Sequence, residues 1–230
     1  MAKNAVASNE RRSNARARRV LIVDDHPVVR QGVAMLIAQE PDLEVCGEAE
    51  GLVDAMRLFN ETSPHLVIID ISLKDGSGVE LVKEIRARNA NTKMLVSSMH
   101  DEELFAERML RAGAHGYVHK QEATDKIIDA ARQVLQGRIY LSEMMSERLL
   151  HRIVSNTESE ARSPIESLSD RELEVFEMIG RGLTTRQIAS RLDLSPKTIE
   201  TYRENIKMKL DLKNSTALTK HAVQWMLENS

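Results

Sequence analysis

The 230-residue chain is poor in the residues on which several classes of protein depend. Its single cysteine, Cys46, excludes a disulfide within the chain and fits a reducing compartment. Aromatic residues make up only 3% of the sequence, which argues against a large pocket for apolar small molecules. No apolar run approaches the roughly 20 residues of a membrane-spanning helix, and the arginine-rich N-terminus lacks the apolar segment of a secretory signal. We therefore expect a cytoplasmic protein that makes no membrane contact.

Net charge is also low, at −3, but the charges are unevenly distributed. Residues 1–19 carry six basic residues and one acid, whereas residues 164–230 carry ten of each. Residues 1–18 show no hydrophobic periodicity, which predicts a disordered basic tail. The remaining composition is that of soluble globular domains, and the length suits two of them.

Two short apolar runs each end in carboxylates. Residues 66–69 lead into Asp70, and residues 19–23 lead into Asp24 and Asp25. Continuous apolar runs of this kind predict strands buried on both faces. If these strands belong to one parallel sheet, the three carboxylates meet at its edge, where sites commonly form. Such a cluster needs a cation, oxygen ligands favour Mg²⁺, and Asp70 could then act as a nucleophile toward phosphorus.

Strand and helix patterns alternate through residues 20–136. The expected strands are 19–23, 43–46, 66–69, 93–99 and 116–118, and the expected helices are 27–39, 51–60, 79–88, 102–112 and 124–136. Strict alternation predicts an α/β domain over residues 19–138, with a parallel sheet covered by helices on both faces. A further helix near 141–154 and a polar linker are expected within residues 139–164.

Residues 165–230 predict four short helices and no strand. Segments 169–172 and 184–187 have the capping-box pattern, and Ser195-Pro196 supplies an N-cap and a first-turn proline to the third helix. Two helices joined by a tight turn form a helix-turn-helix. The inward face of the third helix is expected to comprise Ile199, Tyr202, Ile206 and Leu210. Its outward face carries residue types that contact bases and phosphates, which predicts binding to double-stranded DNA.

Together these motifs resemble those of NarL/FixJ-type two-component response regulators. Residues 20–136 are similar to the receiver domain in Asp24-Asp25, Asp70, Ser98, segment 113–117 and Lys120. Residues 165–228 are similar to the LuxR-type helix-turn-helix domain in segments 168–172, 182–184, 188–189 and 195–203. The resemblance implies a flavodoxin-like, doubly wound five-stranded sheet followed by a small all-α DNA-binding domain.

The resemblance also implies a role for each matching residue of the receiver domain. Asp70 would be the phosphoacceptor. Mg²⁺ would be held by Asp25, Asp70 and the backbone carbonyl of Ser72, with Asp24 acting through water. Lys120 and Ser98 would contact the phosphoryl group, and the ring of Tyr117 would follow Ser98.

In the DNA-binding domain, the residues expected to contact DNA are Lys197, Thr198, Glu200, Thr201, Arg203, Glu204, Lys207 and Lys209. A histidine kinase would be the phosphodonor. A homodimer, formed through the last helix, is expected when the protein is phosphorylated or bound to DNA. We also hypothesise that the unphosphorylated receiver masks the third helix.

Several positions depart from the family pattern. Lys74 stands where many receivers have proline, Thr185 where asparagine is frequent, and Tyr202 where histidine is frequent. Glu200 and Glu204 place two acids on the base-contacting face, where glutamate accepts from cytosine but repels phosphates. Affinity for phosphates is therefore expected from Lys197, Arg203, Lys207 and Lys209, and dimers are expected to bind better than single domains.

Other functions fit parts of the sequence. Phosphatases of the haloacid-dehalogenase type also use a strand-end aspartate with Mg²⁺, but they need a second acid where Ser72 stands, so we do not expect an enzyme. A zinc site at His115 and His119 is disfavoured because their spacing suits a helix rather than a strand. The alternative left open is a receiver-like regulator controlled by something other than phosphorylation, against which the acidic cluster and Lys120 argue.

Overall fold

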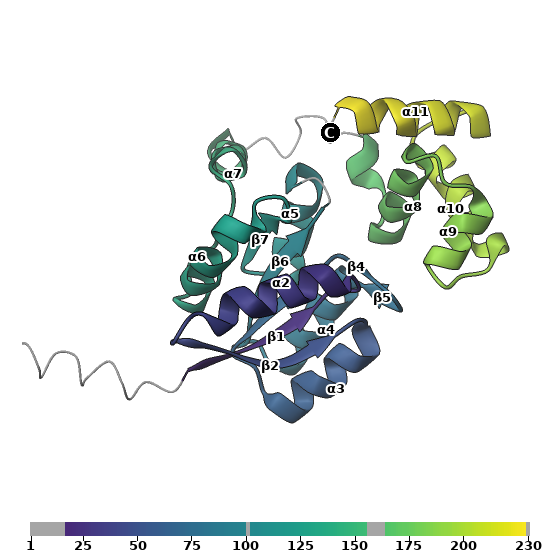
Figure 1. Cartoon of the computed structure of the whole chain (residues 1–230). Helices are drawn as coiled ribbons and strands as arrows, with labels where there is room; N and C mark the ends of the chain where they lie inside the picture. The colour runs from purple at the N-terminus through teal and green to yellow at the C-terminus, as the bar shows by residue number, and fades with distance from the viewer. Residues whose placement is uncertain (1–16, 100–101, 156–163, 229–230) are drawn as a thin grey trace, which may run out of the picture.

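The computed structural model describes residues 17–99, 102–155 and 164–228 (Figure 1). All but the last two residues of the expected tail, and residues 156–163 of the expected linker, lie outside this part. Among the described residues, no helix is long and apolar enough to cross a membrane. An α/β unit is followed by helix α7 (Glu143–Ser155) and then by a group of helices near the C-terminus.

The N-terminal unit contains the expected five-stranded parallel sheet. Its strands, in spatial order, are β2 (Leu43–Ala49), β1 (Arg18–Val23), β3 (Leu66–Ile69), β6 (Lys93–Ser98) and β7 (Gly116–His119). All four neighbouring pairs are parallel. The chain moves outward from β1 to β2 and then returns to the other side of β1, so the strand order reverses between β1 and β3. Sites in open α/β sheets form at this reversal.

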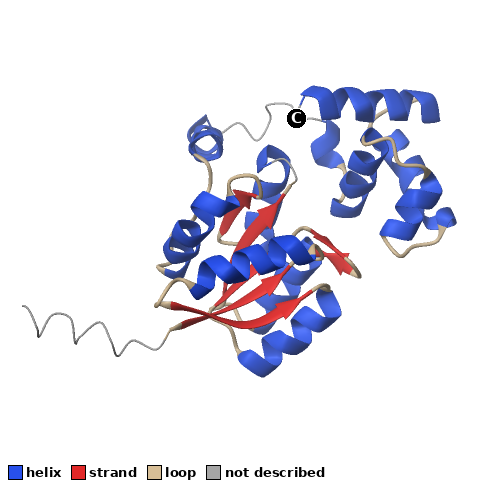
Figure 2. Ribbon diagram, viewed as in Figure 1, coloured by secondary structure: helices blue, strands red, loops and turns tan. Residues whose placement is uncertain are grey.

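Helices cover both faces of the sheet (Figure 2). One face packs against α2 (Pro27–Ala38) and α6 (Ala123–Leu135), and the other against α3 (Leu52–Thr62), α4 (Gly78–Arg88) and α5 (Glu102–Ala112). Alternate residues of β1 point in opposite directions, because Val20 and Ile22 join one buried cluster while Leu21 and Val23 join the other. The flavodoxin-like fold expected from the sequence is confirmed.

A two-stranded hairpin after β3 was not predicted. It pairs β4 (Ser72–Leu73) with β5 (Gly76–Ser77). At Gly78, which begins α4, a Cβ atom would lie 2.2 Å from the carbonyl oxygen of Asp70, so only glycine fits there. Because Gly78 N also donates to Ile71 O at 2.7 Å, the start of α4 is held against the end of β3.

The C-terminal helices are η1 (Pro164–Ser167), α8 (Asp170–Gly180), α9 (Thr185–Arg191), α10 (Pro196–Lys209) and α11 (Ser215–Glu228). Both expected capping boxes are present, at Ser169 and Thr184, and Ser195 caps α10 by accepting from Thr198 N at 3.0 Å. Residues 172–179 of α8 are all buried. Helix α8 is therefore the central element of this unit.

Candidate functional site

The three strand-end carboxylates lie together, as the sequence predicted. Asp24 follows β1 and Asp70 follows β3, and the backbone N–H of Asp70 donates to Val23 O at 2.8 Å, which fixes the two strand ends side by side. One oxygen atom each from Asp24, Asp25 and Asp70, with a nitrogen of His26, fall within 4.8 Å of one another. Parallel pairing of β1 and β3 thus builds the acidic cluster.

Lys120 lies inside this cluster. Its Nζ is 2.8 Å from Oδ2 of Asp24 and 2.6 Å from Oδ2 of Asp70, and its side chain is only 6% exposed. Burial lowers the pKa of Lys120, but the charge of Asp70 and hydrogen bonds to Asp24 and Asp70 outweigh it, so the pKa is raised above its usual value. The lysine is therefore held as an ammonium between two buried carboxylates.

Two other oxygens of the cluster accept hydrogen bonds from backbone N–H groups. Oδ1 of Asp70 accepts from Ile71 N at 2.7 Å, and Oδ1 of Asp24 accepts from His26 N at 2.8 Å. Nδ1 of His26 lies 2.6 Å from Oδ1 of Asp25. His26 directly precedes α2, and it also contributes a nitrogen to the cluster. Ser72 is half-buried in β4, two residues beyond Asp70.

Ser98 and Tyr117, predicted to act as a pair, are neighbours. Both side chains are buried and they share a hydrogen bond. Burial raises the pKa of Tyr117 well above its usual value; the hydrogen bond to Ser98 opposes this, while the carboxylates of Glu177 and Asp70 add to the increase. Since Glu177 belongs to α8, the tyrosine lies within electrostatic reach of the C-terminal unit.

The predicted DNA-contacting helix is α10, and its two faces are as expected. Ile199, Ile206 and Leu210 are buried, and Tyr202 is half-buried. The exposed residues of the outward face are Lys197, Glu200, Thr201, Glu204 and Met208. Thr198 is half-buried, and its hydroxyl lies 2.8 Å from that of Ser195 at the start of the helix.

The cations expected to bind phosphates are mostly engaged within the protein. Nε of Arg203 lies 3.7 Å from Glu200, and Nζ of Lys207 lies 2.8 Å from Glu204. Lys209 is 2.6 Å from Oε2 of Glu172 on α8. Burial raises the pKa of Glu172, but the hydrogen bonds from Lys209 and Ser169 outweigh it and lower the pKa overall. Lys209 therefore links α8 to α10.

The N-terminal unit contacts the start of α8 through polar groups. Nη1 of Arg108, on α5, donates to Leu168 O at 2.7 Å and lies 3.3 Å from Oδ1 of Asp170; its Nη2 donates to Ile165 O at 3.4 Å. Lys83 of α4 lies 3.2 Å from the other oxygen of Asp170. Helices α4 and α5 thus supply cations to the N-terminal end of α8.

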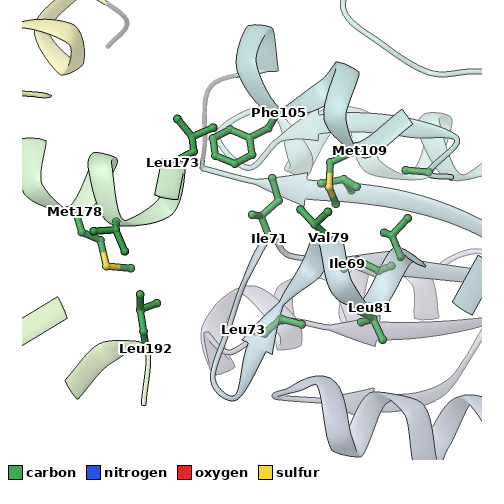
Figure 3. Close-up of a cluster of buried hydrophobic side chains, with 14 of the residues drawn as sticks. Ile69, Ile71, Leu73, Val79, Leu81, Phe105, Met109, Leu173, Met178 and Leu192 are labelled. Carbon is green, nitrogen blue, oxygen red and sulfur yellow. The ribbon is translucent and has the colours of Figure 1, made fainter. Parts of the chain in front are cut away.

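Apolar side chains complete this contact. Figure 3 shows Phe105 of α5 and Leu173 of α8 pointing toward one another, with Ile71 and Val79 of the N-terminal unit close by. These residues are buried in one continuous hydrophobic cluster. Helix α8 is consequently buried on the side that faces α4 and α5, as well as on the sides that face α10 and α11.

The hypothesis that the receiver masks the third helix is wrong for this structure. Lys197, Glu200, Thr201 and Glu204 are all exposed. The N-terminal unit instead covers the start of α8 and the segment before it, because Arg108 contacts Leu168 and Asp170 there and Leu173 joins the same apolar cluster as Phe105. A cleft of about 940 Å³ lies between the two units; Asp25 lines one side of it, and Arg191 and Asp193, at the end of α9 and in the turn after it, line the other.

Comparison with known proteins identifies both units. Residues 20–132 match the response regulator receiver domain, and residues 166–222 match the luxR family of bacterial regulatory proteins. The chain is 34% identical to the oxygen regulatory protein NreC of Staphylococcus carnosus over 210 residues, covering 90% of this chain and 97% of NreC. It is 32% identical to the response regulator GacA of Pseudomonas aeruginosa, covering 90% and 95% of the two chains.

Solved structures have a similar fold over nearly the whole chain. RcsB from Salmonella enterica serovar Typhimurium, bound to the promoter rprA in the presence of the phosphomimetic BeF3-, is 27% identical, with a TM-score of 0.62 over 90% of this chain and 99% of that chain. Another RcsB structure from Salmonella typhimurium is 26% identical, with a TM-score of 0.66 over 90% and 98% of the two chains.

Proposed function

Because the chain belongs to the two-component response regulators that join a receiver domain to a LuxR-type helix-turn-helix domain, we propose that phosphorylation of Asp70 controls its binding to DNA. We place the receiver at residues 19–138 and the DNA-binding domain at 165–230. The observation that carries the proposal is the buried Asp70 carboxylate, which lies 2.6 Å from the Lys120 ammonium at the end of β3. A second carboxylate, Asp24, contacts the same ammonium at 2.8 Å.

The donor atoms of the pocket fit Mg²⁺, which prefers oxygen ligands and commonly uses one or two carboxylates. We assign Asp25, Asp70 and the backbone carbonyl of Ser72 as its ligands, with Asp24 acting through water. When bound, the ion neutralises negative charge on the carboxylates and on an incoming phosphoryl group. Lys120 is then free to pair with phosphoryl oxygen instead of with two carboxylates.

The phosphodonor in the proposed reaction is a phosphohistidine of a partner kinase. A carboxylate oxygen of Asp70 forms a bond to phosphorus while the bond from phosphorus to the histidine nitrogen breaks. The product adds a doubly charged group to a pocket that already holds three acids. We assign Lys120, which already contacts Asp70, and the Ser98 hydroxyl as the groups that satisfy it.

Control of DNA binding follows from the contacts of Ser98 and α8. A Ser98 hydroxyl that turns toward the phosphoryl group gives up its hydrogen bond to Tyr117, whose surroundings include Glu177 of α8. The equilibrium between a docked and a released α8 then shifts, with Arg108 as the main polar contact to be lost. In this proposal the receiver restrains α8, which packs against α10, and does not mask α10 itself.

The released form is proposed to bind double-stranded DNA as a homodimer. One solved structure contains two RcsB dimers bound to two parallel DNAs. In α11 of this chain, Leu218, Ala222 and Trp225 are buried, whereas Val223 and Leu227 remain exposed. The last helix can therefore cover α8 and still offer an apolar surface to a second copy.

The same proposal places the protein in the cytoplasm, where the kinase domain and the DNA are, and assigns it no enzymatic turnover of another substrate. The alternative is a regulator of the same fold that is controlled without phosphorylation. The two functions differ in whether Asp70 accepts a phosphoryl group and in whether DNA binding then changes.

Incubation with acetyl phosphate and Mg²⁺ tests the proposal. The intact mass of the full chain is expected to rise by one phosphoryl group, and the modification is expected to be absent in Asp70→Asn and present in the matched control Asp54→Asn. Labelling of Asp70→Asn to the level of the parent would reject Asp70 as the acceptor. An unlabelled parent that still binds DNA would favour the alternative.

Binding to DNA is tested with Lys197→Ala and Thr201→Ala. Both residues are exposed on α10, so the domain is expected to stay folded while affinity for a selected DNA site falls about tenfold. Unfolding curves of the variants provide the control. Affinity equal to that of the parent in both variants would reject the assigned face.

A further inference from the structure

The two acids on the outward face of α10 are held differently. Glu200 extends toward α9, where the hydroxyl of Thr185 donates to its Oε1 at 2.7 Å. Its Oε2 lies 3.7 Å from Nε of Arg203. Both oxygens of Glu200 thus have neighbours within the helix-turn-helix, and one neighbour belongs to the preceding helix.

Glu204 lies one turn further along α10 and has no such link. In the part of the chain that the structure describes, its one ion pair is with Lys207 of the same helix, at 2.8 Å. The Glu204 side chain is 62% exposed, compared with 54% for Glu200. Although the Lys207 side chain is only 16% exposed, the carboxylate of Glu204 faces solvent, so it can turn away from Lys207 toward another partner at modest cost.

The angle between α9 and α10 matters for DNA recognition. A recognition helix contacts base edges in the major groove while the preceding helix lies across the backbone, so both contacts form only at a fixed mutual orientation. Ile188, Ala189 and Ile199 fix the two helices on the buried side. The hydrogen bond between Thr185 and Glu200 joins them on the exposed side.

We propose that Glu200 is a positioning residue that holds α10 against α9, and that Glu204 is the acid that contacts a base pair. This inference rests on the proposed binding to DNA. In the major groove a carboxylate accepts from the amino group of cytosine and is repelled by the acceptor atoms of guanine and thymine. Glu204 therefore selects for a cytosine at one position of each half-site. Glu200 instead raises affinity for DNA without changing which base is preferred at any position.

The test uses the full chain, phosphorylated, with duplexes selected from a pool of random sequence. Thr185→Val keeps every charge and removes the donor, and it is expected to lower affinity for the selected duplex about fivefold without changing the preferred bases. Thr185→Ser, which keeps a hydroxyl, is the matched control. Glu200→Gln retains an acceptor for Thr185 and is expected to keep the base preferences and not to lower affinity.

Two further variants separate the acids. Glu200→Ala combined with Thr185→Val is expected to bind no more weakly than the weaker single variant, because both substitutions remove the same hydrogen bond. Glu204→Gln is expected to lose the cytosine preference at one base pair and to bind random-sequence duplex more tightly. Thermal unfolding of each full-length variant checks that the fold is retained.

The outcomes that overturn the inference are distinct from those that overturn DNA binding itself. If Glu200→Ala changes the preferred base at one position while Thr185→Val binds as the parent does, Glu200 contacts a base and the inference is wrong. Retention of every base preference in Glu204→Gln would remove the role of that acid. A parent protein that selects no sequence from the pool would reject both the inference and the proposed function.

Discussion

The acidic pocket of the receiver and the outward face of α10 both combine acids with basic residues, but they differ in burial. Asp24 and Asp70 are 4% and 3% exposed, and the lysine between them is hardly more so. Glu200 and Glu204 are more than half exposed. Attraction between charges is strong where water is excluded and weak where solvent and salt screen it.

This difference suggests a division of roles. In the pocket, each charge depends on its partners, so we expect a change in total charge to affect the whole site, including Ser98 and Tyr117. On α10, the carboxylates are exposed although their cations are largely covered, and we expect these carboxylates to exchange partners more easily when DNA binds. The receiver is built to respond to one added group, and the helix to exchange partners.

The largest effect on stability is expected from Lys120→Met. This substitution leaves two buried carboxylates without their cation, which costs about 3 to 5 kcal/mol when one partner of a buried ion pair is removed. Urea unfolding without divalent ions measures the loss, and added Mg²⁺ is expected to restore part of it. Lys126→Met, which removes an exposed partner of Glu122, is the control. Equal stability of Lys120→Met and the parent would show that charges in the buried pocket are no more strongly coupled than those on α10.

A smaller but still marked effect is expected from Arg108→Ala. The guanidinium donates to two backbone carbonyls and pairs with Asp170, so its removal weakens the docking of α8 by about 1 to 3 kcal/mol. Amide hydrogen exchange in η1 and at the start of α8 is expected to accelerate. Arg111→Ala removes an exposed arginine of the same helix and is expected to leave exchange unchanged. Equal exchange in both variants would show that Arg108 does not hold α8.

Much of the receiver follows from local sequence signals. The apolar runs that lead into Asp24 and Asp70 predicted buried strands, and strict alternation of strands and helices then required a parallel sheet whose strand ends meet. The hairpin of β4 and β5 gave no signal, because strands of two residues have no periodicity. The capping boxes at Ser169 and Thr184 set the helix starts of the second unit.

Two contacts between distant parts of the chain were not predictable in this way. Arg108 meets Leu168, which is 60 residues further along the chain, and Lys209 meets Glu172, 37 residues before it. No sequence pattern links such distant residues. The pair Glu204–Lys207 is different, because a spacing of three residues on a helix predicts contact. This spacing could have shown that Lys207 is paired with Glu204 rather than available for DNA phosphates.

A moderate pH effect is expected from His115, which is half-buried and accepts a hydrogen bond from Met94 N at 3.3 Å. Burial lowers its pKa to about 4, with help from Lys93 and Arg86. A histidine with a lowered pKa stabilises the fold above its unfolded pKa of about 6.5, and this contribution is lost as pH falls through the window down to about 4.

Between pH 7 and pH 5 the parent should therefore lose about 1 kcal/mol more stability than His115→Gln, after allowance for its partial exposure. Urea unfolding at the two pH values measures the difference. The expected effect on stability is smaller than that in the buried pocket and larger than that on the exposed face of α10. Parallel losses in the parent and the variant would show that His115 is not the titrating group.

The smallest effect is expected where the charges are most exposed. Glu204→Gln removes the carboxylate that lies 2.8 Å from Lys207, but a helical pair at this spacing with an exposed acid contributes only about 0.5 kcal/mol to the free energy of unfolding. Urea midpoints of this variant and of the parent should coincide within that range, and 1 M salt should remove what difference remains. A loss of several kcal/mol would mean that α10 depends on this pair for its fold, and the contrast with the pocket would no longer hold.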